Sequence, residues 1–170
     1  MPDTNPKSTA QIRGHPIHPM LVLFPVAFLV STLATDIIYL ATANPAWATA
    51  SIWLVGTGVV TALIAALAGF ADFFGESRIR QIRDAWRHMI GNLIVVTLAI
   101  VSWWLRASGG AEEAVAPWGV TLSVLTGAIL LYTGWKGGEL AYRYRVGVHD
   151  AFPEPPTYTP NPQQKRRESV

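Results

Sequence analysis

Residues 14–35 read GHPIHPMLVLFPVAFLVSTLAT, and their only titratable groups are His15 and His18. A bilayer core needs roughly 20 apolar residues per helix, and the run that begins at Met20 is long enough to cross it. Three further charge-poor segments follow, so the expected spans are residues 20–40, 48–70, 89–105 and 118–135. Short loops favour antiparallel neighbours. The sequence therefore predicts an all-α fold, an integral membrane four-helix bundle with up-down-up-down topology.

The composition supports the same class. Of the 170 residues, 51% are hydrophobic and only 14% are charged, against about 25% charged in soluble domains. The sequence ATA at residues 41–43 resembles a signal cleavage site, but the apolar run before it exceeds a typical signal core, so we expect an uncleaved first helix. The absence of cysteine excludes disulfides, thiolate metal sites and cysteine-ligated iron–sulfur clusters. We expect the lipid bilayer, and no nucleic acid, as a partner.

Lysine and arginine are distributed unequally between the expected loops. The leader, the second loop and the residues after the fourth span hold 12 of the 13, and the third loop holds only Arg106. Cytoplasmic loops carry the excess of Lys and Arg, so we predict a multi-pass protein of the bacterial inner membrane with both termini in the cytoplasm. The expected regions are a polar leader (1–17), a membrane domain (18–146) and a proline-rich tail (147–170). The tail is too polar to pack and is predicted to be disordered.

Small residues recur at helical spacing in two of the spans. Because small residues let membrane helices approach closely, we expect close helix packing along three rows: Gly58, Ala62 and Ala66; Thr61, Ala65 and Gly69; and the pair Gly134 and Gly138. No internal repeat is visible in the sequence.

Polar residues at the expected cytoplasmic helix ends form a candidate site. Its members come from four helices: His15, His18, Asp72, His88 and Glu139. Pro25 removes a helical hydrogen bond, so we expect a kink just above His18. Each residue also has a structural explanation, because Glu139 is four residues from Arg143 and Asp72 has Arg78 and Arg80 nearby. Asp36, the only acid inside a span, is either a functional carboxylate or an interhelical hydrogen-bonding group near the outer interface.

Several of these motifs together resemble the DUF2231 family of predicted bacterial membrane proteins. The resemblance rests on GHPIHPMLVLFP, on Asp36 in TDIIY, on Asp72 in GFADF, on His88 before the third span, and on GWKGGELAYRYRVGV, and it covers about residues 13–149. Some family members are fused to Rieske-type iron–sulfur domains, so the resemblance implies redox chemistry near the membrane.

Three functions fit these residues. The sequence favours a non-catalytic structural or accessory membrane subunit, because no nucleophile motif or phosphate-binding loop is visible and each polar residue has a helix-end explanation. The second is a haem b electron-transfer protein in which His18 and His88 ligate the iron from diagonal helices. The third is a divalent transition-metal site with nitrogen and oxygen ligands from His15, His18, Asp72, His88 and Glu139. Either cofactor would imply a membrane or redox protein partner. A transporter is disfavoured.

Overall fold

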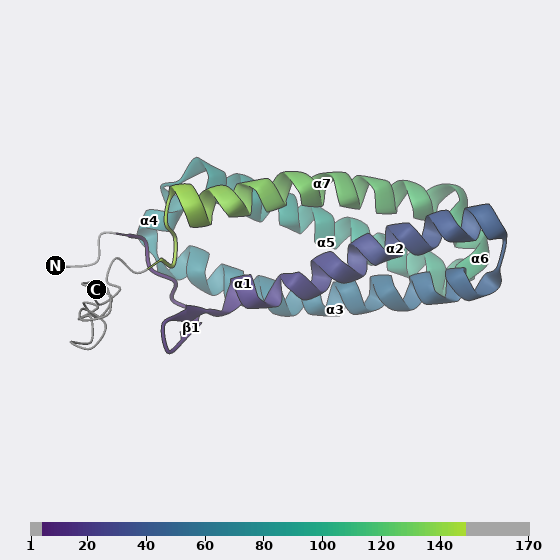
Figure 1. Ribbon diagram of the computed structural model, residues 1–170, viewed down its shortest axis with the longest axis horizontal. Coiled ribbons are helices and arrows are strands. Elements are labelled where there is room, and N and C mark those ends of the chain that lie inside the picture. Colours follow the sequence, from purple (N-terminus) through teal and green to yellow (C-terminus); the bar gives the residue numbers. More distant parts are fainter. Residues whose placement is uncertain (1–4, 149–170) are drawn as a thin grey trace, which may run out of the picture.

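The structure, a computed structural model, describes residues 5–148 and consists mainly of four long antiparallel helical segments (Figure 1). Helix α1 (Ile17–Leu21) leads into α2 (Leu23–Thr42), and α3 (Pro45–Gly75) returns along it. Short α4 (Ser77–Arg80) precedes α5 (Arg83–Gly109). The chain returns through α6 (Ala111–Ala114), the π-helix η1 (Val115–Gly119), α7 (Val120–Gly138) and the π-helix η2 (Glu139–Arg143). A two-residue hairpin of β1 (Gln11–Ile12) and β2 (His15–Pro16) precedes α1.

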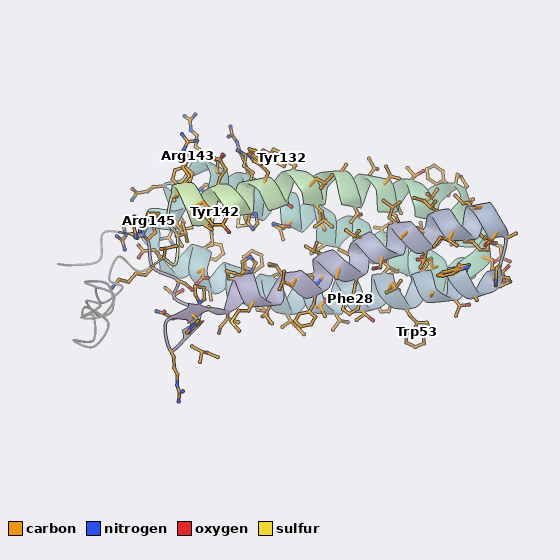
Figure 2. The ribbon with its side chains drawn as sticks, in the orientation of Figure 1. Phe28, Trp53, Tyr132, Tyr142, Arg143 and Arg145 are labelled. Carbon is orange, nitrogen blue, oxygen red and sulfur yellow. The ribbon has the colours of Figure 1, made fainter. Side chains whose placement is uncertain are left out.

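Four segments are long and apolar enough to cross a membrane: Ile17–Thr42, Pro45–Gly75, Arg83–Gly109 and Ala111–Arg143. Helix α2 packs against α3 and α7, and α5 also packs against α3 and α7, so α2 and α5 are diagonal. Large apolar side chains cover the outside; Trp53, 74% exposed, points away from the bundle (Figure 2). The predicted integral membrane four-helix bundle is confirmed. The part of the predicted disordered tail that follows residue 148 lies outside the described residues.

Local sequence explains where the first long helix bends and stops. The helix is interrupted at Val22, three residues before the buried Pro25, whose ring leaves no N–H to donate back along the helix. Ala43 ends α2 in the left-handed conformation, with φ of 52°. Asn44 then caps α3 by accepting a hydrogen bond from the Ala46 N–H at 3.0 Å, and Pro45 occupies the first helical position.

Two apolar clusters fill the interior. The central one joins all four helices through Leu29, Val55, Val59, Val95 and Ala99, with Ile129 and Leu130 against it. The second joins α3, α4 and α5 through Phe73, Ile79 and Ala85. We call the end of the bundle that holds α1, α4 and η2 the histidine end, and the end that holds α6 the Asp36 end. The described parts of both termini lie at the histidine end (Figure 1).

The small-residue rows had different outcomes. In α3, Gly58 packs against Leu29, and Ala62 and Ala65 are buried, as expected for close packing. Gly134 and Gly138 have no described atom within 4 Å of the position that a Cβ would take, so the expected packing at this pair is wrong within residues 5–148. The sequence also placed Arg106 in a loop, whereas it lies in α5 and is 1% exposed.

Candidate functional site

His18 projects from α1 onto a glycine of α3. A Cβ on Gly69 would lie 3.0 Å from two atoms of the His18 ring, so the imidazole occupies space that only glycine leaves free. The His18 Nδ1 is 2.8 Å from the carbonyl oxygen of Ala65. A carbonyl oxygen can only accept a hydrogen bond, so Nδ1 carries the proton and Nε2 carries the lone pair.

His88 repeats this arrangement in the second half of the chain. Its ring lies against α7, where a Cβ on Gly137 would be 3.1 Å from the His88 Cε1. Its Nδ1 is 2.9 Å from the carbonyl oxygen of Thr133. In both halves the accepting carbonyl belongs to the residue four before the glycine. The second imidazole is therefore held in the same tautomer, with its lone pair on Nε2.

The two imidazoles face each other across the bundle. Their ring centroids are 6.1 Å apart and their planes are nearly perpendicular, at 88°. The Asn92 side chain lies beside this pair, because its Nδ2 is 3.2 Å from the His88 Nε2 and donates to the His88 carbonyl at 2.8 Å. The predicted pairing of His18 with His88 from diagonal helices is therefore present as geometry.

The other candidate ligands lie at the same end with different partners. His15 is exposed, and its Nδ1 contacts the Arg13 carbonyl at 3.1 Å. The Asp72 carboxylate accepts hydrogen bonds from the leader, at 2.8 Å from the Ser8 hydroxyl and 2.7 Å from the Ala10 N–H, so the expected pairing with Arg78 or Arg80 is wrong.

Glu139 forms the expected ion pair with Arg143, at 3.2 Å. Within residues 5–148, no three His, Cys, Asp or Glu side chains converge on a point that could hold a metal ion. Of the five candidate residues, His18 and His88 are the two whose rings are in contact among the described residues.

A second polar group lies at the Asp36 end, and the sequence predicted only one member of it. Asp36 Oδ2 accepts from Arg106 Nη2 and from the Ser123 hydroxyl, each at 2.6 Å, and Oδ1 accepts from the Ser51 hydroxyl at 2.5 Å. The side chains of Asp36 and Arg106 are both 0% exposed. Arg106 also donates to the carbonyl and hydroxyl of Ser102. All four long helices contribute to this ion-pair network.

The network borders a small internal cavity. The cavity has a volume of about 10 Å³, enough for one water molecule. Four hydroxyl-bearing residues line it: Thr32, Ser102, Ser123 and Thr126. Among the described residues, Arg106 Nε is the buried side-chain atom without a hydrogen-bond partner. Between this cavity and the histidines lies the central apolar cluster, so the two polar groups are separate sites.

Spacing was the signal that could have identified Arg106. His88 follows His18 by 70 residues, and Arg106 follows Asp36 by the same 70. The unit α1–α3 and the unit α5–α7 each supply one histidine and one charged residue at equivalent positions. Members of each pair meet near the line between the two hairpins.

One family model matches residues 14–150; it describes DUF2231, a predicted membrane protein. The chain belongs to this family. No curated protein and no solved structure matches the chain. Most of the matched DUF2231 segment lies within the described residues, and both histidines of the pair fall inside it.

Proposed function

We propose that this DUF2231 protein is a membrane-embedded electron carrier that binds haem b between His18 and His88. The observation that supports the proposal is the pair of facing imidazoles, one from each hairpin, with centroids 6.1 Å apart. Metal–nitrogen bonds of about 2 Å place the centroids of two imidazoles on opposite sides of one ion about 6 Å apart. The separation therefore suits two axial ligands of a single iron.

The tautomers support the same proposal. Ligating histidines commonly donate the other ring N–H to a carbonyl, which fixes ring orientation. Here the carbonyls of Ala65 and Thr133 hold Nδ1 of each ring, which leaves Nε2 as the ligand atom. Asn92 would have to release the His88 Nε2 for a metal to bind there.

The number of protein ligands favours a porphyrin over a bare ion. A bare transition-metal ion takes four or more ligands, whereas the described residues bring together two imidazoles and no third His, Cys, Asp or Glu. A porphyrin supplies four equatorial nitrogens and needs only axial ligands from the protein. His18 and His88 would hold the haem, and the group would supply one-electron transfer.

The proposed orientation places the histidine end in the cytoplasm. Of the 13 Lys and Arg residues, 12 lie in the leader, between residues 78 and 87, or from residue 136 onward. Arg106, the remaining one, is buried against Asp36 and adds no exposed charge to the other end. The positive-inside rule then supports cytoplasmic termini in the bacterial inner membrane.

A structural role in an accessory membrane subunit is the second candidate. It is favoured by the same hydrogen bonds, because each imidazole also ties a helix to its neighbour within one hairpin. Under this candidate the histidines need no ligand, and their replacement reduces stability without changing any absorption spectrum.

Haem titration of the purified protein distinguishes the two functions. We expect a low-spin, six-coordinate haem spectrum in the wild-type protein, its loss in His18→Leu and in His88→Leu, and its retention in the matched control His15→Leu. Binding should weaken as the pH falls, because protonated imidazole cannot ligate a metal. A wild-type protein that gives no six-coordinate spectrum with added haem would overturn the proposal.

A further inference from the structure

A partly buried ion pair lies one helical turn from His88, toward the end of the bundle. Asp84 precedes His88 by four residues on α5, so both side chains lie on one face of that helix. Lys136 immediately precedes Gly137, the glycine against which the His88 ring lies. Lys136 Nζ is 3.1 Å from Asp84 Oδ1, and the pair joins α5 to α7 beside the histidines.

The groups around Asp84 carry a net positive charge. Arg87 Nη1 is 3.0 Å from the same Asp84 Oδ1, so one carboxylate is shared between two cations. The Tyr144 hydroxyl approaches Asp84 Oδ2 at 3.5 Å. The Lys136 side chain is only 15% exposed, whereas Arg87 is 55% exposed and Arg143, in a neighbouring ion pair, is 70% exposed. Lys136 is therefore the inward-lying cation of this group.

We propose that Lys136 binds a carboxylate on the rim of the cofactor held by His18 and His88, so that the ligand is a porphyrin with free acid groups directed to the histidine end. The inference rests on the proposed function and specifies its ligand. A porphyrin rim is apolar except where it carries carboxylates, and a charge is costly in the bilayer core. The acidic edge must therefore face the helix ends, where Lys136 supplies an ammonium with three N–H donors.

The opposite side of the site carries a carboxylate near the glycine that contacts His18. Asp72, three residues after Gly69, is held by the leader through Ser8 and Ala10. A ligand carboxylate beside Asp72 would meet a like charge that these neutral donors do not offset, whereas the charge of Asp84 is offset by Lys136 and Arg87. The histidine pair is symmetric between the hairpins, but the charge beside it is not, and this asymmetry fixes which way the acidic edge turns.

The experiment compares two iron porphyrins, haem and haem dimethyl ester, titrated into the full-length apoprotein. We expect haem to bind the wild-type protein about tenfold more tightly than the ester, as for one hydrogen-bonded charge pair. Lys136→Gln should remove this preference and leave ester affinity unchanged, and Lys136→Arg should retain it. Arg143→Gln, which also removes one cation from an ion pair at this end, is the matched control and should retain it too.

Three results would overturn the inference. If the wild-type protein binds haem and haem dimethyl ester with equal affinity, the haem carboxylates make no favourable contact with the protein. This result needs no variant. An equal loss of both ligands in Lys136→Gln shows that the lysine only ties α5 to α7. If the wild-type protein binds neither porphyrin, both the proposed function and this inference are wrong. If it binds the ester and gives the six-coordinate spectrum, the proposed function is still supported.

Discussion

The two ends of the bundle use equivalent positions of the two hairpins in opposite ways. At the Asp36 end two hydrogen bonds cross between hairpins, from Arg106 and Ser123 of the second to Asp36 of the first. At the histidine end the bonds of His18 and His88 to helix carbonyls stay within each hairpin. The first pair therefore joins the hairpins directly through an ion pair, whereas the second brings two imidazole rings close together without a hydrogen bond between them.

The largest expected loss of stability comes from breaking the ion pair of Asp36 with Arg106. Asp36→Leu leaves the Arg106 charge buried without its counter-charge, and we expect a loss of about 3–5 kcal/mol in the free energy of unfolding. Denaturant unfolding in detergent micelles measures it. The double variant Asp36→Leu with Arg106→Leu should recover most of the loss, because no unpaired charge remains. A single variant within about 0.5 kcal/mol of wild type would contradict the assignment of this network as the joint between hairpins.

A smaller loss in the free energy of unfolding is expected when Asp36 keeps its ion pair with Arg106 and loses one of its hydroxyl hydrogen-bond donors. Ser123→Ala removes a hydrogen bond to a buried charge across the hairpin boundary and should cost about 2 kcal/mol. Ser51→Ala removes one within the first hairpin, at similar cost. The same unfolding measurement compares them. If Thr121→Ala, an exposed hydroxyl on α7, destabilises as much as Ser123→Ala, the network has no special role.

Adding a methyl group to either glycine that contacts a histidine tests the packing at the histidine end. Gly69→Ala and Gly137→Ala place a Cβ within 3.0 and 3.1 Å of the imidazoles. Overpacking should exceed the gain in helix propensity, for a net loss of about 1–2 kcal/mol, and haem affinity should fall in both. Gly134→Ala, with no described atom within 4 Å, is the control and should be neutral or stabilising. Unequal effects of the two substitutions on haem binding would show that the hairpins do not contribute equally.

The smallest effect concerns an ion pair at the histidine end outside the spanning segments. Hydrogen bonds from Arg78 lower the pKa of Glu76 from 4.5 to about 2. Because the folded-state pKa is lowered, this contribution to stability is present above pH 4.5 and is lost as the pH falls toward 2. Glu76→Gln should therefore lower Tm at pH 6 and leave it nearly unchanged near pH 2. A difference that persists undiminished at the low pH would contradict the linkage.

Much of the architecture follows from the sequence alone. Four charge-poor segments of membrane-spanning length leave few folds available, because backbone groups in lipid must be satisfied within helices. The ion pair of Glu139 with Arg143 follows from its spacing of four residues on one helix. Local rules also predict the interruption near Pro25. The diagonal relation of the first and third spans follows from short loops, and it placed His18 opposite His88.

Only the tertiary structure decided which polar residues meet. Asp72 turns to the leader, and Arg106 turns inward to Asp36, because a partner from another helix outweighs any partner in the local sequence. Gly137, and not Gly134 or Gly138, serves close packing, since the choice depends on the rotation of α7 against α5. The spacing of 70 residues is visible in the sequence, but only the packing shows that the members of each pair lie close together. The periodicity of the sequence determines which residues share a face of one helix. The packing of all four helices determines which residues that face contacts.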